Sequence, residues 1–370
     1  MLHHSKTYLE IDLSALVDNY RFLRSKLKPQ TKFLAVIKAF AYGHEAIAIA
    51  KALEKETVDY FAVAYVREGI SLRDAGIITP ILVLHPQRDE AEICQKYQLE
   101  PNIYSFSLLE NYLKTLSTKT SKTCPIHLKF NTGLNRLGFK PSDIGKLAEI
   151  IQSNPSVKVQ SVFSHLIASE DLSLKAITQK QIVTYFDIVS KLEQALGYSF
   201  IKHLTNTSGT LNYPEAHFDM VRSGIGLYGY GNDDQWTKQL KIVGKLYSTI
   251  TQIHDIDIGQ SVGYNQGYIA NEFTRSATIP LGHADGIPRS WGKGKGYMTI
   301  NGKKAKILGN VCMDMTMVDV TNIDCQEGDQ VIIFDKQDTV EAIAERTGTI
   351  SYELLTNISQ RVPRHIVLSK

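Results

Sequence analysis

The stretch Phe33-Leu34-Ala35-Val36-Ile37-Lys38-Ala39-Phe40-Ala41-Tyr42-Gly43-His44 joins an apolar run to one lysine and a Tyr-Gly-His turn. Successive apolar and β-branched residues are typical of a strand buried on both faces, and the apolar positions of residues 46–53 have helical spacing. The stretch therefore predicts a buried strand that ends at Lys38, followed by a helix. In parallel α/β proteins ligands bind at this edge, where a lysine with a disfavoured ammonium form is a nucleophile for Schiff-base chemistry. The alternative is a lysine that reaches solvent from a strand end.

The same order of strand and helix continues through residue 235. Eight alternations in about 220 residues match a (β/α)8 barrel, and an open doubly wound sheet is the structural alternative. The predicted strands are residues 34–38, 60–66, 80–84, 100–105, 126–131, 159–165, 201–205 and 218–223. The predicted helices include residues 45–54, 68–75, 90–97, 107–116, 141–152 and 174–197.

The sequence changes character after residue 235. Short strand-like runs joined by Gly-rich turns predict a mainly β domain over residues 236–370, after a barrel domain over residues 1–235. Residues 1–12 are expected to supply a strand shared with the second domain. The expected strands of the second domain are residues 244–253, 275–280, 298–300, 304–308, 315–319 and 330–334, and helical spacing returns at residues 339–347 and 351–359.

Composition excludes several classes of protein. The chain has 370 residues, 43% of them hydrophobic and 21% charged, and a formal net charge of only +3, so neither nucleic acid nor an anionic membrane is an expected partner. No apolar run approaches the roughly 20 residues needed to cross a bilayer. The N-terminus lacks an apolar signal core, which favours a cytoplasmic location. The four cysteines Cys94, Cys124, Cys312 and Cys325 show no Cys-x-x-Cys spacing, and no metal site is expected.

Polar residues follow several of the predicted barrel strands. Lys38 ends the first, Arg136 follows the fifth, His165 ends the sixth, Asn206-Thr207 follows the seventh and Arg222 ends the eighth. Because the working residues of such barrels lie at the carboxyl ends of the strands, we expect these side chains to converge. Taken singly, a histidine after a strand is more often structural, and a lone arginine is more often a surface charge.

Residues 224–229 contain a Gly-x-Gly-x-x-Gly pattern, which alone suggests a dinucleotide site. No helical periodicity follows the pattern, so we prefer a phosphate site. In barrels the loops after strands seven and eight commonly bind phosphate through backbone N–H groups. Residues 206–209 and 223–225 form such loops here, and the hydroxyl of Thr207 or Tyr42 is a further candidate donor.

Taken together, these segments resemble the alanine racemase family along nearly the whole chain. Four positions depart from the usual pattern of that family: Phe40 in place of asparagine, Glu45 in place of glycine, Asn265 in place of glycine, and His283 in place of tyrosine. The matching pieces are the lysine stretch above and residues 131–138, 163–165, 203–208, 222–225, 262–264, 282–286, 311–314 and 350–353.

The resemblance implies a pyridoxal 5'-phosphate enzyme that interconverts L-alanine and D-alanine and supplies D-alanine for peptidoglycan. Racemisation removes a proton from one face of the α carbon and returns it to the other, so two acid/base groups are needed. By resemblance these are Lys38, which holds the cofactor covalently and acts on the D face, and Tyr264, which acts on the L face. Tyr264 would act in the site of the partner subunit, which makes a homodimer the expected active form. We expect alanine to remain the preferred substrate.

The resemblance assigns the other candidates as follows. Arg222 faces the pyridine nitrogen, which then stays unprotonated because a guanidinium keeps its proton. Arg136 binds the substrate carboxylate, with Met313 of the partner subunit. The phosphate and cofactor residues are Tyr42, His165, Asn206, Thr207, Gly224, Ile225 and Tyr352, and the supporting residues are Lys129, which matches a lysine carbamylated in some relatives, His283, Cys312 and Asp314.

Two other functions remain open from the sequence. A pyridoxal-phosphate decarboxylase of the same architecture would also use Lys38, although the contexts of Tyr264 and of residues 312–314 favour the racemase. A non-catalytic pyridoxal-phosphate carrier of the single-barrel type would lack the second domain that residues 236–370 supply.

Overall fold

The computed structural model describes residues 6–116 and 123–369. The chain divides into two compact units. Of the described residues, 17–41, 46–116 and 123–240 form one, which we call the barrel unit, and 6–16, 42–45 and 241–369 form the other, which we call the β unit. The predicted domain limits, 1–235 and 236–370 with a shared strand in residues 1–12, stay predictions.

The barrel unit is built around an eight-stranded parallel sheet in the order β8-β7-β6-β5-β4-β3-β2-β9. Its two end strands meet, because Asp219 N donates to Lys202 O at 3.0 Å and Arg222 N donates to Thr205 O at 3.2 Å. The sheet therefore closes on itself, so the predicted barrel is confirmed and the open doubly wound alternative is wrong. The strands are β2 (Lys32–Val36), β3 (Tyr60–Val63), β4 (Ile81–Val83), β5 (Leu99–Ile103), β6 (Cys124–Lys129), β7 (Val157–Phe163), β8 (Ile201–His203) and β9 (Met220–Ser223).

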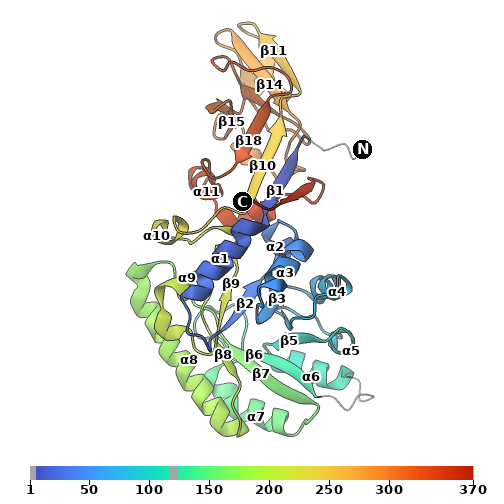
Figure 1. Cartoon of the computed structure of the whole chain (residues 1–370), viewed down its shortest axis with the longest axis vertical. Helices are drawn as coiled ribbons and strands as arrows, with labels where there is room; N and C mark the ends of the chain where they lie inside the picture. The colour runs from blue at the N-terminus through green and yellow to red at the C-terminus, as the bar shows by residue number, and fades with distance from the viewer. Residues whose placement is uncertain (1–5, 117–122, 370) are drawn as a thin grey trace. The chain divides into compact units, whose positions relative to one another are not determined.

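Helices cover the outside of this sheet, as Figure 1 shows. Helix α7 (Ile144–Gln152) illustrates the reason: its buried residues Ile144, Leu147, Ala148 and Ile151 recur at helical spacing and form one apolar face. The other helices that belong wholly or partly to this unit are α1 (Leu13–Ser25), α3 (Ala46–Lys55), α4 (Val66–Asp74), α5 (Ala91–Lys96), α6 (Phe106–Thr115), α8 (Lys175–Leu196), α9 (Thr207–Asn212) and α10 (Asp234–Thr237), with the 3-10 turns η1 (Pro141–Asp143), η2 (Leu172–Leu174), η3 (Pro214–Ala216) and η4 (Ile225–Tyr228).

The β unit contains a six-stranded sheet in the order β16-β15-β18-β10-β1-β19, a three-stranded sheet β11-β14-β17 and a two-stranded hairpin β12-β13. Two short helices, α11 (Val340–Thr347) and α12 (Ser351–Thr356), complete the unit, with the 3-10 turns η5 (Tyr264–Gln266) and η6 (Arg289–Trp291). The mainly β second domain is confirmed. Its strands are β1 (Tyr8–Asp12), β10 (Gly244–Thr249), β11 (Gln252–Ile256), β12 (Ser261–Val262), β13 (Tyr268–Ile269), β14 (Thr274–Ile279), β15 (Tyr297–Ile300), β16 (Lys303–Lys306), β17 (Thr316–Asp319), β18 (Gln330–Phe334) and β19 (Arg364–Val367).

One sequence expectation for the β unit is wrong, and strands β12, β13 and β19 were not expected. The single strand expected over residues 244–253 is two strands, because β10 pairs with β1 and β18 whereas β11 pairs with β14 in another sheet. Strand β19 pairs in parallel with β1 at the opposite end of the sequence, so its partner lies beyond the reach of local pattern.

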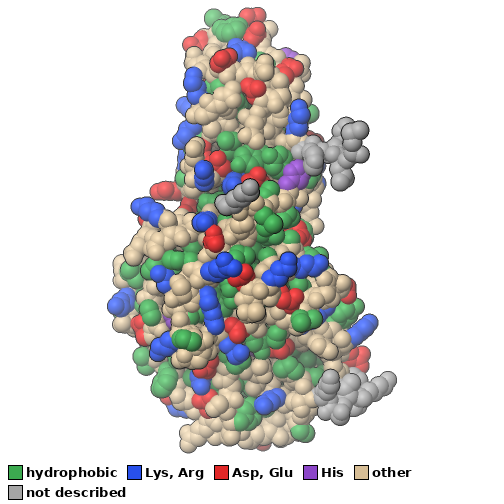
Figure 2. All heavy atoms as spheres, in the orientation of Figure 1, with side chains coloured by type: hydrophobic (Ala, Val, Ile, Leu, Met, Phe, Trp, Pro, Cys, Tyr) green, Lys and Arg blue, Asp and Glu red, His purple; other side chains and the backbone are tan. Residues whose placement is uncertain are grey.

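The charged surface fits the small net charge. Figure 2 shows basic and acidic side chains interspersed on the face in view. Over the described ranges, 6–116 and 123–369, no helix is long and apolar enough to cross a membrane.

Candidate functional site

Lys38 opens an unusual backbone turn rather than closing a strand. Strand β2 ends at Val36, two residues earlier than predicted, and residues Lys38–Tyr42 form a short helical segment, α2. Ala39, Phe40, Ala41 and Tyr42 have φ between 52° and 56°, so the turn is left-handed. A left-handed turn of non-glycine residues costs about 1–2 kcal/mol per residue, so the surrounding structure must hold it in place.

Glu68 of α4 holds the start of this turn. Its carboxylate accepts hydrogen bonds from Ala39 N at 2.7 Å, from Ala64 N at 2.6 Å and from Tyr65 N at 3.1 Å. One side chain thus ties the residue after Lys38 to the end of β3 and the beginning of α4. We infer that Glu68 fixes the direction in which the Lys38 side chain leaves the backbone.

Three cationic side chains, those of Lys129, Arg136 and Arg222, interact electrostatically with Lys38. Burial lowers the pKa of Lys38, with contributions from Arg136 and Arg222, while the Glu68 carboxylate opposes the fall. Burial, with contributions from Arg136, Arg222 and Lys38, lowers the pKa of Lys129 to about 8. A cluster of this kind binds anions and leaves a larger share of the two amines neutral and nucleophilic. The structure therefore brings together Lys38, Lys129, Arg136 and Arg222.

Arg222 is buried and fixed by four acceptors. Its Nη2 donates to Ser164 O at 2.8 Å and Leu204 O at 3.0 Å, and lies 3.2 Å from His165 Nδ1. Its Nη1 lies 3.2 Å from His203 Nδ1. Because a guanidinium only donates, both imidazoles must accept at Nδ1 and are neutral.

Burial and the cationic neighbours agree with that protonation state. Burial, together with the charge of Arg222, lowers the pKa of His165 and of His203 well below 6.5. Burial lowers the pKa of Arg222 itself to about 10, so it remains a cation at neutral pH.

The loops after β8 and β9 pack tightly against each other. Thr207 Oγ1 accepts from Gly224 N and Gly226 N, both at 3.3 Å, and lies 2.9 Å from Ser223 Oγ. A Cβ on Gly226 would meet Thr207 Cγ2 at 2.6 Å, so only glycine permits this approach. The two loops together gather hydroxyl groups and backbone N–H groups in one place, which is the composition of a phosphate site.

Two predicted site residues in these loops, Asn206 and Ile225, differ in which of their atoms can contact a ligand. The Asn206 side chain caps α9 by accepting from Gly209 N at 2.9 Å and also accepts from Ser169 Oγ at 2.7 Å. Its side-chain oxygen is therefore engaged in supporting the loop. Ile225 is buried, so it can offer only its backbone to a ligand.

The remaining candidates belong to the β unit. Tyr42 and Tyr352 lie side by side, with ring centroids 5.9 Å apart, and burial raises the pKa of Tyr42, so its hydroxyl keeps its proton. Next to them Gly43 has φ 82°, and a Cβ there would overlap the Leu355 carbonyl oxygen. Arg364 donates to the carbonyl oxygens of Gly43 and His44 at 2.7 and 3.0 Å, which anchors the end of the turn that Lys38 begins.

Tyr264 lies in the η5 turn between β12 and β13, and its side chain is 71% exposed. The next residue, Asn265, has φ 56° and ψ 35°. Asparagine tolerates the left-handed region better than other non-glycine residues, which explains how it can replace the glycine of the resembling family. Phe40 also replaces the family's usual residue, an asparagine, in left-handed backbone, and no such tolerance applies to phenylalanine.

Met313 lies on a loop that is pinned to the neighbouring segment, and its side chain is 59% exposed. His283 N donates to Cys312 O at 2.9 Å and Ala284 N donates to Met313 O at 3.0 Å. Arg361 bridges Asp314 at 2.6 Å and Asp285 at 2.8 Å. Asp314 therefore supports the loop, whereas Tyr264 and Met313 are left exposed.

Sequence reasoning missed Glu68, Arg361 and His203. Glu68 is the third residue of α4, but the residue before the helix is Tyr65, so the usual Ser/Thr signal of a capping box is absent. Arg361 and His203 work through partners far away in sequence, and no local pattern marks them.

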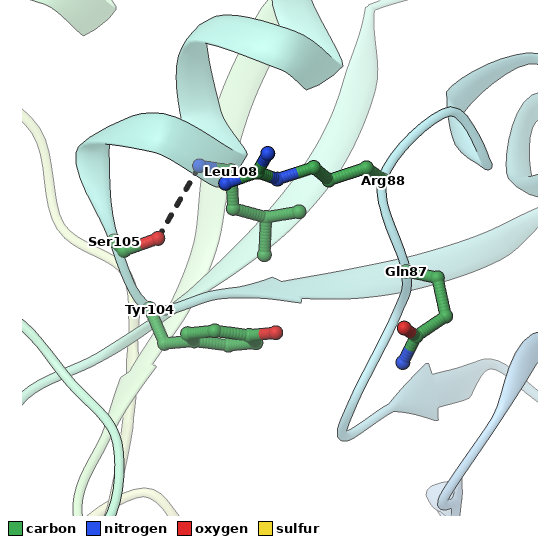
Figure 3. Close-up of a pocket in the computed structure, with 5 residues that line it drawn as sticks. All are labelled: Gln87, Arg88, Tyr104, Ser105 and Leu108. Atoms are coloured by element: carbon green, nitrogen blue, oxygen red, sulfur yellow. Dashed lines mark hydrogen bonds between the residues drawn. The ribbon is translucent and has the colours of Figure 1, made fainter.

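The barrel unit contains a cavity of about 400 Å³, which is lined by the segments that follow β4 and β5 and by none of the candidate residues. Figure 3 shows its lining residues Gln87, Arg88, Tyr104, Ser105 and Leu108. Arg88 already donates to Ser107 at 2.8 Å, and the Ser105 side chain caps α6. None of these five residues belongs to the predicted site. Among the described residues, no group of three or more His, Cys, Asp and Glu side chains could hold a metal ion.

Comparison with known proteins matches both units. Residues 11–232 match the family model for the N-terminal domain of alanine racemase, and residues 243–366 match the model for its C-terminal domain. The alanine racemase of Carboxydothermus hydrogenoformans is 36% identical over 367 residues, which cover 96% of this chain and 98% of that protein.

Solved structures agree. The alanine racemase of Clostridium difficile 630 has a TM-score of 0.91 and 34% identity, with 98% of this chain and 96% of that chain covered. The alanine racemase of Bartonella henselae, solved with covalently bound pyridoxal phosphate, has a TM-score of 0.88 and 30% identity, with 98% and 100% covered.

Proposed function

The chain belongs to the alanine racemase family and interconverts L-alanine and D-alanine with pyridoxal phosphate, and we propose that Lys38 and Tyr264 supply the two acid/base groups of that reaction. The observation that supports the proposal best is the lowered pKa of Lys38 within a cluster of cations. An amine in this setting can form a bond to an aldehyde and can also accept a proton near neutral pH.

The residues of the barrel unit fit the chemistry of the cofactor. Pyridoxal phosphate carries an aldehyde, a phenolic oxygen, a pyridine nitrogen and a phosphate. An amine at Lys38, cations at Arg136 and Arg222, and the hydroxyl groups of Thr207 and Ser223 in the two loops match these four groups. When bound, the cofactor makes the α proton of alanine acidic enough to be removed.

Lys38 and Arg222 have distinct tasks in this proposal. Lys38 accepts the α proton on the D face of alanine and returns a proton to that face in the reverse reaction. Arg222 keeps its guanidinium proton and donates towards the pyridine nitrogen, which favours racemisation over side reactions. Arg136 binds the substrate carboxylate, a role that its electrostatic effects on Lys38 and Lys129 support.

The residues proposed to bind the phosphate lie in the loops after β8 and β9 and in the pair Tyr42 and Tyr352. We assign the phosphate to Tyr42, Thr207, Gly224, Ile225 and Tyr352, with Asn206 supporting its loop and His165 supporting Arg222. Lys129, His283, Cys312 and Asp314 are assigned supporting roles.

We assign Tyr264 to the L face, together with Met313, and we propose that both act in the site of a second copy of the chain. The support is their exposure, 71% and 59%, on pinned loops of the β unit. A homodimer would cover both side chains and complete each site. A cytoplasmic location and a supply of D-alanine for peptidoglycan complete the proposal, and the four free cysteines agree with a reducing compartment.

A mixing experiment tests the shared site. Lys38→Ala and Tyr264→Phe are purified separately, loaded with pyridoxal phosphate, and assayed alone and after subunit exchange. Each variant alone should convert little L-alanine. A mixed dimer carries one intact site, so activity should return after exchange to about half of the wild-type value per mixed dimer, because one of two sites works. No recovery after exchange demonstrated by mass would contradict a site that two subunits share.

The carrier and decarboxylase alternatives have no specific observation in their favour. A single-barrel carrier lacks the C-terminal domain that residues 243–366 match. Release of carbon dioxide from L-alanine would be the sign of the decarboxylase, and none is expected.

A further inference from the structure

A chain of hydrogen-bonded polar side chains runs from Glu100 across neighbouring barrel strands to Arg222. Glu100 of β5 lies 2.7 Å from Nε2 of His127 on β6. Nδ1 of His127 lies 2.5 Å from Oγ of Ser161 on β7. Ser161 Oγ lies 2.8 Å from Nε2 of His203 on β8, and His203 Nδ1 lies 3.2 Å from Arg222 on β9. Each link passes from one strand to the next, and we call these five residues the relay.

The two ends of the relay determine where every proton lies. Arg222 only donates, so His203 must accept at Nδ1 and carry its proton on Nε2. That proton goes to Ser161, whose own hydroxyl proton then goes to His127 Nδ1. His127 is left with its proton on Nε2, which it donates to Glu100. Because a carboxylate only accepts, the direction agrees from both ends, and the chain of donors has a single orientation.

The setting of Arg222 explains why a remote carboxylate matters. Ser161, His127 and His203 have no exposed surface, and Arg222 is only 5% exposed. No described carboxylate forms an ion pair with Arg222, whose four acceptors are two carbonyls and two imidazoles. A buried cation without a counter-charge is costly, and a polarised chain of hydrogen bonds can spread its charge towards a distant carboxylate.

Other charged groups face the two ends of the relay. At the Glu100 end, Tyr60 and Arg73 both interact electrostatically with the carboxylate. Arg73 donates to four backbone carbonyls and makes no ion pair with Glu100 among the described contacts. Glu100 is therefore available to act as the acceptor end of the relay. At the other end the surrounding cations are Lys38, Lys129 and Arg136.

We propose that Glu100 is a positioning residue for Arg222, and that it acts through His127, Ser161 and His203 as an oriented hydrogen-bond relay. The relay gives the buried guanidinium a counter-charge and keeps the adjacent imidazole neutral, with its acceptor nitrogen turned to Arg222. The effect on the reaction rests on the role proposed above for Arg222. The orientation of the relay does not depend on that role.

Nitrogen NMR of histidine-labelled, full-length protein tests the orientation without turnover. The long-range ¹H–¹⁵N pattern of a neutral ring distinguishes a proton on Nε2 from one on Nδ1 and from a charged ring. In the wild type, His127 and His203 should both be neutral and protonated on Nε2, with assignments made by substituting each histidine. A charged ring, or a proton on Nδ1 of either histidine, would overturn the proposal, and the wild-type spectrum alone decides this point.

Glu100→Gln tests the part played by the carboxylate. The amide can turn either its oxygen or its NH2 group to His127, so His127 should change from one tautomer to a mixture. Glu54→Gln is the matched control, because Glu54 also accepts hydrogen bonds within the barrel unit, from Thr79 and Ile78, and does not touch the relay. If Glu100→Gln does not fold, Ser161→Ala cuts the relay instead and should move the His127 Nδ1 resonance to that of an unbonded nitrogen.

A second measurement links the relay to Arg222. In the protein loaded with pyridoxal phosphate, Glu100→Gln should raise the ratio of transamination to racemisation by about threefold, because the guanidinium is weakened but not removed. Glu54→Gln should leave the ratio unchanged. If the two variants give the same ratio and the same His127 spectrum, Glu100 does not position Arg222. If neither protein racemises alanine, the proposed function fails while the NMR result still decides the relay.

Discussion

The left-handed turn after Lys38 should depend on one carboxylate. In Glu68→Ala, three backbone N–H groups, those of Ala39, Ala64 and Tyr65, lose their acceptor. These bonds are at most partly buried, so we assign about 1 kcal/mol to each, and the free energy of unfolding should fall by about 3 kcal/mol. Urea denaturation followed by circular dichroism measures this loss.

Loss of stability alone would not show that Glu68 serves Lys38, so the control is Glu54→Ala. The Glu54 carboxylate also accepts three hydrogen bonds, from Ile78 N, Thr79 N and Thr79 Oγ1, at 2.7 to 2.9 Å. The two variants should therefore lose similar stability. Only Glu68→Ala releases the residue after Lys38, so only this variant should bind the cofactor poorly.

The assay is borohydride trapping of pyridoxal phosphate on the chain, with the modified lysine identified by mass spectrometry. The yield on Lys38 should fall in Glu68→Ala and stay at the wild-type level in Glu54→Ala, under conditions where both are folded. The pH dependence gives a second reading. Since the Glu68 carboxylate raises the pKa of Lys38, its removal should shift the onset of trapping to lower pH. Equal yields and equal onsets in the two variants would refute the role assigned to Glu68.

Three further predictions follow from the site. Arg222→Glu should raise the ratio of transamination to racemisation, because a carboxyl group can share a proton with the pyridine nitrogen; product analysis with an unchanged ratio would contradict this. Folding lowers the pKa of Lys129 from 10.5 to about 8, so burying its ammonium destabilises the folded state below pH 8. As the pH rises above 8, Lys129 loses its proton in the folded state but keeps it in the unfolded state, and this destabilisation disappears. The free energy of unfolding of the wild type, relative to Lys129→Met, should thus be flat below pH 7 and increase by about 2–3 kcal/mol between pH 8 and 10; a decrease in that window would show the wrong sign. Gly43→Ala forces a side chain into left-handed backbone against the Leu355 carbonyl and should cost about 2–5 kcal/mol, measured by urea denaturation; a loss under 1 kcal/mol would mean that the turn can shift.

The barrel was predictable because the local sequence pattern identifies its strands. Strand β3, Tyr60–Val63, consists of buried apolar residues, and helices such as α7 repeat apolar residues at helical spacing. The polar residues at the carboxyl ends of the strands, such as Lys38, His165 and Arg222, could be identified for the same reason, because each follows an apolar run. Their convergence then followed from the geometry of a barrel.

The turn after Lys38 was not predictable, because Ala39-Phe40-Ala41 contains no glycine or asparagine to signal left-handed backbone. Long-range contacts hold it instead, from Glu68 and from Arg364. Contacts between distant segments leave no local sequence pattern, so the relay, whose five members come from five strands, was not predictable either. Nor was β19, which pairs with β1 from the other end of the sequence.

The most direct test of the two-base assignment is exchange of the α proton of each alanine enantiomer with deuterated water, in Tyr264→Phe loaded with pyridoxal phosphate. Lys38 can still remove and return a proton on the D face, so D-alanine should gain deuterium while racemisation is strongly reduced and L-alanine keeps its proton. If Tyr264→Phe exchanges both enantiomers equally, or exchanges L-alanine alone, then Lys38 and Tyr264 do not serve opposite faces of the substrate and the assignment is wrong.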